Sequence, residues 1–139
     1  MKMMIEGVNL PVRKTKGSGG YDIYCPANIM LSAGTWTKID TGILMEPGDI
    51  PEGCFGMIVP RSSMGNRYGL RLANTVGIID SDYTMDTIKA MITVDERISN
   101  VVIEQNDRIL QMVIVPYSTM PNEIMPMNER TGGHGSTGR

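Results

Sequence analysis

The sequence is poor in aromatic residues and has no excess of basic ones, which narrows the ligands that the protein can bind. Aromatic residues make up 5% of the 139 positions, and the formal net charge is -2. Proteins that bind nucleic acid usually present a positive surface, and those that bind single strands add aromatic side chains for the bases to stack on. The composition therefore argues against direct binding to nucleic acid.

Cysteine and long apolar runs are scarce as well. Cys25 and Cys54 do not have CxxC spacing, and no cluster of histidines or cysteines surrounds them. This pattern does not fit a disulfide framework or a zinc site, so we expect reduced thiols in the cytoplasm, or in the host cytoplasm for a viral protein. The first twenty residues carry several charges without an apolar run, and we expect neither a signal peptide nor a membrane span.

Helical periodicity is almost absent, and strand patterns take its place. Residues 87–94 alternate, with Ile88, Ala90, Ile92 and Val94 on one side. Residues 108–117 are apolar on both faces over their middle, which predicts a central, buried strand. Further strands are expected at 35–45, 53–60, 68–74, 76–80 and 100–104. Many short strands with turns about every ten residues predict an all-β sandwich or jelly roll.

The composition changes after Tyr117, and the chain closes on "RTGGHGSTGR". Glycine loses much backbone freedom on ordering, and this segment has no aliphatic side chain to bury in return. Either it is disordered, or a ligand that it grips supplies the ordering energy. We therefore expect a single all-β domain at residues 1–117 and a flexible C-terminal arm at residues 118–139.

Residues 59–69, "VPRSSMGNRYG", combine types that suit an anion site. Ser62 or Ser63 could cap a short helical turn over residues 64–67, which would leave backbone N–H groups facing outward. Arg61 would add a bidentate donor for phosphate oxygens. The ordinary alternative is a capped turn with a surface arginine.

Residues 74–86, "NTVGIIDSDYTMD", suggest a general base. An apolar strand runs into Asp80, and a polar strand leaves after residue 86, which predicts a β-hairpin with an acidic tip and with Tyr83 as a wall. Aspartates are also common in ordinary turns. Elsewhere, Asp22 follows a glycine-rich lead, and Gln111 interrupts an apolar run, where a buried amide must find a hydrogen-bond partner.

Five stretches, taken in order, resemble the five motifs of the trimeric dUTP nucleotidohydrolases (dUTPases). They read "GSGGYDIY", "PRSSMG", "NTVGIIDSDY", "RILQM" and "RTGGHGSTG". The resemblance implies an all-β, distorted jelly-roll or β-clip-like barrel that assembles as a homotrimer. It implies Mg²⁺-dependent hydrolysis of dUTP to dUMP and pyrophosphate, which limits uracil in DNA and supplies dUMP for dTMP synthesis. Two neighbouring subunits would supply four motifs to each site, and the arm of the third would close over the nucleotide.

The resemblance also implies residue roles. Asp80 would deprotonate the water that attacks the α-phosphorus, and Asp22 would hold a water of the Mg²⁺ shell. Asn74 and backbone groups of the hairpin would read the uracil edge, and Tyr83 would pack beneath the deoxyribose. The other substrate contacts would come from Arg61, Ser62, Ser63, Gly77, Ile79, Ile88, Gln111, Arg130, Gly133, His134, Gly135, Ser136 and Thr137.

Three features depart from the family pattern. Met85 stands where the family usually has glycine, and His134 replaces the aromatic residue that stacks on uracil. The spacing from Arg130 to the glycines is one residue shorter than the pattern. These departures predict a differently shaped turn and weaker, pH-dependent stacking.

Three alternatives remain at this point. A dCTP deaminase would share the fold but would need a glutamate in the hairpin region, and no glutamate lies between Cys54 and Val94. A dUTPase-shaped regulator would bind a protein partner, either in place of turnover or as a second role. A carbohydrate-binding or capsid jelly roll would have no use for an Arg-Ser pair, an acidic tip and a glycine-rich arm together.

Overall fold

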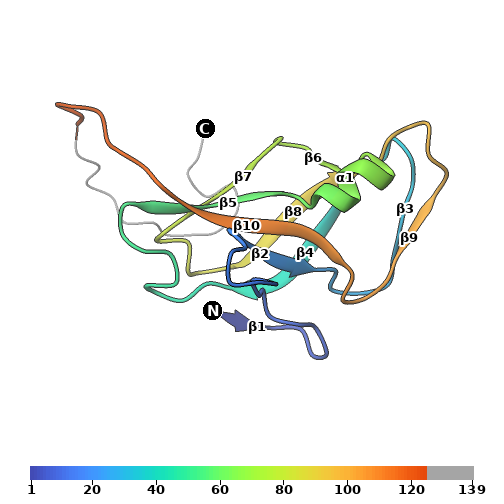
Figure 1. Ribbon diagram of the computed structural model, residues 1–139, viewed down its shortest axis with the longest axis horizontal. Coiled ribbons are helices and arrows are strands. Elements are labelled where there is room, and N and C mark those ends of the chain that lie inside the picture. The colour runs from blue at the N-terminus through green and yellow to red at the C-terminus, as the bar shows by residue number, and fades with distance from the viewer. Residues whose placement is uncertain (125–139) are drawn as a thin grey trace.

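The computed structural model describes residues 1–124, which form two four-stranded antiparallel sheets and a smaller pair of strands (Figure 1). The first sheet has the order β1-β4-β8-β6 and comprises β1 (Lys2–Met3), β4 (Thr37–Leu44), β8 (Thr87–Thr93) and β6 (Arg71–Leu72). The second has the order β2-β10-β5-β7 and comprises β2 (Gly20–Tyr24), β10 (Arg108–Pro116), β5 (Cys54–Pro60) and β7 (Gly77–Asp80). The pair consists of β3 (Ile29–Leu31) and β9 (Val101–Ile103), and helix α1 (Ser62–Tyr68) follows β5.

One hydrophobic core joins these sheets. The alternation predicted for residues 87–94 is confirmed as far as Ile92: Ile88 and Ile92 are fully buried and Ala90 nearly so, with Val94 buried too. It breaks at Thr93, which was expected on the opposite side but is also buried. Side chains from the other strands complete the cluster, among them Ile23, Ile39, Ile43, Ile58, Ile109 and Leu110. Burying this many branched aliphatic side chains is the main favourable contribution to folding.

The predicted all-β, jelly-roll-like fold is confirmed, and the expected strand ranges contain β4 to β10 apart from a few end residues. β10 lies between β2 and β5, as its apolar character predicted. Its second half is less buried than expected, since residues 113–115 are only partly covered. β1 and β3 were not expected, because strands of two or three residues are too short to show alternation.

The hairpin expected at residues 76–94 is not formed. β7 pairs with β5 in one sheet, whereas β8 pairs with β4 and β6 in the other. The segment from residue 81 to residue 86 therefore crosses between the sheets. A strand pattern identifies strands but not their partners, so the sequence could not exclude this arrangement.

The described chain ends in an irregular segment after β10. Residues 118–124 contain no helix or strand, and Figure 1 shows this segment leaving the body of the molecule beyond β10. No helix within residues 1–124 has the length and apolar character needed to cross a bilayer. The division into a domain and an arm stays a prediction. The arm positions that were expected to bind substrate lie outside the described residues: Arg130, Gly133, His134, Gly135, Ser136 and Thr137.

Candidate active site

Asp22 is the centre of a charged cluster where β2, β10 and the end of β5 meet. Its side chain is 9% exposed, and its two oxygens bind different arginines. Arg61 Nε lies 2.8 Å from Oδ1, and Arg108 Nη1 donates to Oδ2 over 3.0 Å. A carboxylate this far from water needs such partners, because an unpaired buried charge costs several kcal/mol. The cluster of Asp22, Arg61 and Arg108 is called the arginine cluster below.

The arginine cluster is suited to an anionic ligand. Two guanidinium groups and one carboxylate leave a single net positive charge. Arg61 and Arg108 are only partly exposed, at 24% and 35%, so their charges are less screened than those of surface arginines. Each guanidinium carries five N–H donors, and Asp22 uses only some of them. The remaining donors can bind phosphate oxygens.

Gln111 lies beside this cluster. It is opposite Asp22 on β2 and opposite Val59 on β5. Its Nε2 is 3.5 Å from the carbonyl oxygen of Pro60, a long hydrogen bond that leaves donor capacity for a ligand. A Cβ on Gly20 would stand 2.7 Å from Gln111 Oε1, so glycine at that position lets the amide lie against β2. The side chain is half-buried, not fully buried as the sequence suggested.

The serines that follow Arg61 do not cap the helix. The N-cap of α1 is Arg61 itself, and no side-chain hydrogen bond caps it. Ser62 and Ser63 are exposed residues of the first turn instead. The amides of Met64 and Gly65 both donate to the Arg61 carbonyl, at 3.0 and 2.9 Å. The capping prediction was therefore wrong. Neither serine hydroxyl makes the cap hydrogen bond that serine often provides at a helix N-terminus.

A cavity of about 190 Å³ opens between β7 and β8 and is called the base cavity below. Asn74, Gly77 and Ile79, which were all predicted to bind substrate, line it. Its other lining residues are Ile58, Leu72, Ala73, Ile78, Lys89, Ala90 and Met91. Ile88 is fully buried in the core, so only its backbone can contact a ligand. A mostly apolar cavity with a few polar groups is the usual form of a small-molecule site.

β7 leaves hydrogen-bonding groups available at this cavity. It is the last strand of its sheet, so only the edge that faces β5 is paired within the described sheets. The N–H and C=O groups of an edge strand can pair with a ligand as they would with another strand. The cavity thus combines fixed backbone donors and acceptors with apolar walls.

Asp80 is the last residue of β7 and is exposed. It lines a second cavity, of about 370 Å³, together with Ser81, Asp82, Phe55 and Tyr117 among others. Tyr83 follows in the turn, where its hydroxyl donates to the Thr87 carbonyl over 3.1 Å and its ring is 6% exposed. A rigid strand end thus carries an accessible carboxylate beside the base cavity.

One chain does not bring Asp80 and the arginine cluster together. Asp80 pairs with Phe55 in β5, whereas Arg61 follows Pro60 at the other end of that strand. Six residues of extended chain span about 20 Å. The predicted residues therefore form two groups: a base cavity with Asp80, and the arginine cluster with Gln111.

Sequence reasoning assigned no role to Arg108. A β-bulge lies between Arg108 and Leu110, and it shifts the register of β10 against β2. Strict alternation does not give the direction of a side chain at a bulge, so no sequence signal could pair Arg108 with Asp22.

Comparisons with known proteins agree with these observations. The family model described as dUTPase matches residues 6–138. A deoxyuridine 5'-triphosphate nucleotidohydrolase of Paramecium bursaria Chlorella virus 1 is 31% identical over 142 residues, covering 99% of this chain and 96% of the relative. That of Escherichia phage T5 is 42% identical over 113 residues, covering 78% and 72%. The dUTPase of Streptococcus mutans superposes with a TM-score of 0.69 at 28% identity, covering 86% and 97%. The dUTPase from phage phi11 of S. aureus superposes with a TM-score of 0.75 at 22% identity. A likeness at this low identity shows the fold alone.

Proposed function

Because this chain belongs to the dUTPase family, we propose that it hydrolyses dUTP to dUMP and pyrophosphate. The observation that carries this proposal is the accessible carboxylate of Asp80 at the end of β7, directly beside a base-sized cavity. The reaction would limit uracil in DNA and supply dUMP for dTMP synthesis. The family match favours this activity over a dCTP deaminase, and the strand ends in an aspartate where a deaminase would need a glutamate.

The base cavity supports recognition of uracil. Uracil presents two carbonyl acceptors around one N–H donor, which the free edge of β7 and the Asn74 amide can satisfy. Cytosine reverses part of this pattern and would leave buried polar groups unpaired, at a cost of about 1–3 kcal/mol for each group. We expect the shape of the cavity to exclude a 5-methyl group. The backbone polarity of β7 cannot be changed by rotating a side chain, so selectivity is built into the strand.

Asp80 is suited to act as the general base. Its carboxylate accepts a proton from a water molecule that attacks the α-phosphorus, and pyrophosphate leaves from the opposite side. The strand fixes the position of the carboxylate, which is what a base that orients water requires. Tyr83 is held in place by its hydrogen bond to the Thr87 carbonyl, and the deoxyribose would pack against it. In this role the tyrosine leaves little room for a 2′-hydroxyl.

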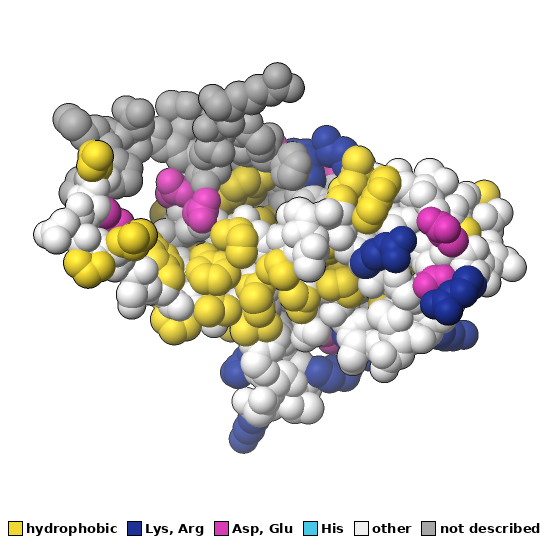
Figure 2. Space-filling model, turned by 90° about the horizontal axis from the view of Figure 1, so that it is seen from above, with side chains coloured by type: hydrophobic (Ala, Val, Ile, Leu, Met, Phe, Trp, Pro, Cys, Tyr) yellow, Lys and Arg dark blue, Asp and Glu magenta, His cyan; other side chains and the backbone are white. Residues whose placement is uncertain are grey.

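A complete site needs more than one chain. About 20 Å of β5 separates Asp80 from Arg61, and a bound triphosphate is shorter than that distance. We therefore assign the base cavity and Asp80 to one subunit of a homotrimer and the arginine cluster, Ser62, Ser63 and Gln111 to its neighbour. Figure 2 shows hydrophobic side chains gathered across one face of the molecule, as a contact between copies requires. Ile78 and Tyr117 are large exposed hydrophobic residues that line the same cavity as Asp80.

Mg²⁺ fits this site only through the substrate and water. No three His, Cys, Asp or Glu side chains within residues 1–124 are grouped to hold a metal. Asp22 binds arginines with both oxygens, yet each oxygen keeps a lone pair that can accept from a water of a hydrated Mg²⁺. When bound, the ion would neutralise part of the triphosphate charge. A mutant of the dUTPase from phage phi11 of S. aureus has been described with a structural Mg(II) ion.

The arm is assigned to the third subunit. Arg130, Ser136 and Thr137 would meet the phosphates, Gly133 and Gly135 would allow close backbone approach, and His134 would stack on uracil. These positions lie outside the described residues, so this assignment rests on the motif alone. Binding of the triphosphate would supply the energy that orders a glycine-rich segment.

Nucleotide turnover tests the proposed function. With Mg²⁺, the protein should release pyrophosphate from dUTP and much less from dCTP, dTTP or UTP. Asp80→Asn should lower kcat by at least about a hundredfold, since a positioned general base contributes about that much. The same variant should still bind a non-hydrolysable dUTP analogue in calorimetry. Ammonia release from dCTP would identify a deaminase instead, and no reaction with any of the four nucleotides would contradict the proposal and favour a regulator that binds a protein partner.

A further inference from the structure

Among the described residues that line the base cavity, Lys89 is the one that carries a charge. It lies on β8, and its side chain is 18% exposed, so most of its stem is covered. An ammonium group is a strongly hydrated charge with three donors on a flexible stem. Inside a cavity that reads an uncharged base, it would compete for the same carbonyl oxygens. Its position therefore has to be controlled.

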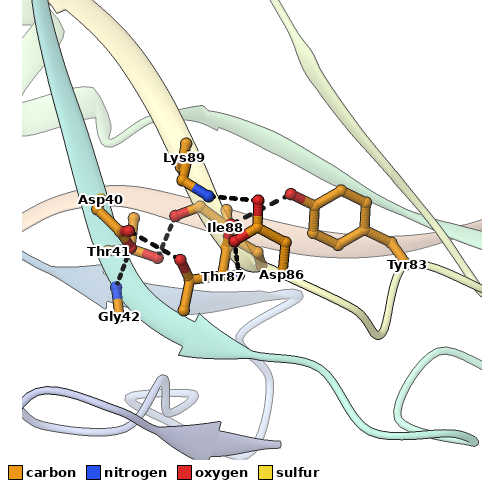
Figure 3. A network of polar contacts seen from close by, with 8 residues as sticks. All are labelled: Asp40, Thr41, Gly42, Tyr83, Asp86, Thr87, Ile88 and Lys89. Atoms are coloured by element: carbon orange, nitrogen blue, oxygen red, sulfur yellow. Dashed lines mark hydrogen bonds and ion pairs between the residues drawn. The ribbon is translucent and has the colours of Figure 1, made fainter. Parts of the chain in front are cut away.

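Asp86 controls the position of this ammonium group. Lys89 Nζ binds Asp86 Oδ2, and the Thr87 amide donates to the other carboxylate oxygen over 2.8 Å. Figure 3 shows the lysine amine pointing toward Asp86. The carboxylate raises the pKa of Lys89, and the ammonium lowers the pKa of Asp86, so both groups stay charged near neutral pH.

Asp86 is itself anchored to β4 through the start of β8. Thr87 Oγ1 donates to Asp40 Oδ2 over 2.8 Å, and Thr41 Oγ1 donates to the Ile88 carbonyl over 2.8 Å. Tyr83 adds its hydrogen bond to the Thr87 carbonyl (Figure 3). These bonds hold the start of β8 both from β4 and from Tyr83 in the turn, so the Asp86 carboxylate cannot easily move when the Lys89 side chain moves. The ammonium group is therefore paired with an acceptor in a fixed position.

We propose that Asp86 is a positioning residue that holds the Lys89 ammonium at the rim of the base cavity and so keeps the cavity open to an uncharged pyrimidine. This inference rests on the proposed function, since it assigns the cavity to uracil. Without the carboxylate, the ammonium can turn toward Asn74 and the carbonyl oxygens of β7, whose residues line the same cavity. The freed lysine then competes with the base.

A pair of substitutions separates this role from simple structural support. Asp86→Asn keeps the shape of the side chain but removes its charge, and we expect it to raise KM for dUTP about tenfold with kcat changed by less than about threefold. Lys89→Met keeps the stem and removes the ammonium. Adding it to Asp86→Asn should lower KM again, to within about threefold of the wild-type value, because the competing group is gone.

The opposite result would overturn the inference. If the double variant is no better than Asp86→Asn, the ion pair only supports the fold, and thermal unfolding of the three variants should then show parallel losses. Binding of dUMP, measured by calorimetry on the same proteins, separates this inference from the proposed function. A wild-type protein that binds dUMP without hydrolysing dUTP would contradict the proposed activity but leave the role of Asp86 to be judged from the dUMP affinities. A wild-type protein that binds neither would contradict both.

Discussion

Asp22 shows how a single carboxylate organises the arginine cluster, which we propose binds phosphate. It binds Arg61 from the end of β5 and Arg108 from β10, and so it holds two guanidinium groups in fixed positions without a ligand. Preorganised charges stabilise a transition state more than mobile ones, because they need no reorganisation during the reaction. The carboxylate lowers the net charge of the cluster but increases its rigidity.

A substitution at Gly20 tests whether Gln111 contacts the substrate. A Cβ at Gly20 would stand 2.7 Å from Gln111 Oε1, too close for an unshifted amide. Gly20→Ala should therefore displace Gln111 and lower kcat/KM for dUTP about tenfold, as expected for the loss of one phosphate hydrogen bond. Gly19→Ala is the matched control, because nothing lies within 4 Å of its Cβ. Equal kinetics for the two variants would mean that Gln111 does not contact the substrate.

The residue scale also shows what the sequence could predict. Asn74, Gly77 and Ile79 line one cavity, and Asp80 lines the neighbouring one, while their roles stay predictions. The grouping of Gly77, Ile79 and Asp80 could be anticipated because all three lie on one strand, where the direction of each side chain is fixed. Arg108 lies next to a bulge, and the Lys89–Asp86 pair depends on a turn that crosses between two sheets. The sequence could predict neither contact, because local spacing and composition do not specify the geometry of a bulge or of a turn between sheets.

Strand β4 contains a local irregularity. Its pairing with β8 shifts register between Asp40 and Leu44. Gly42 lies within this bulge at a φ of 70°, and its amide donates to Asp40 Oδ1 over 3.0 Å. The same Asp40 carboxylate receives Thr87 Oγ1, so the bulge positions the acceptor that anchors the start of β8. A local irregularity in one strand thus supports the turn that carries Asp86.

Replacing Gly42 should destabilise the protein more than replacing a glycine with the same backbone strain. Gly42→Ala places a Cβ 2.6 Å from Ile5 Cγ1, whereas Gly48→Ala, at a φ of 88°, meets nothing within 4 Å. Both variants incur about 1–2 kcal/mol for a left-handed alanine. Overpacking against Ile5 should add about 1–3 kcal/mol to the first alone. Urea unfolding measures the difference, and equal losses would show that Ile5 moves aside without cost.

At the scale of the whole molecule, the proposed site is a shared one. Asp80 and the arginine cluster lie at opposite ends of β5, so in the proposed arrangement each chain contributes two half-sites to different nucleotides. A closed ring of subunits places complementary half-sites next to one another at every interface. Assembly and catalysis are then coupled, because a lone chain has no complete site.

Mixing two inactive variants tests this arrangement. Asp80→Asn and Arg61→Ala should each be nearly inactive as pure proteins. When they are refolded together from denaturant, about one quarter of the sites should receive an intact Asp80 from one chain and an intact Arg61 from its neighbour, by random assortment around a closed ring. Pyrophosphate release from dUTP should recover to about that fraction of the wild-type rate. Gln111→Ala serves in place of Arg61→Ala if the latter fails to fold, since it leaves the ion pairs of Asp22 intact; its own residual activity, measured on the pure variant, is then the baseline above which the mixture must rise. A mixture that stays as inactive as its components would place both residues in the site of a single chain and contradict the shared-site assignment.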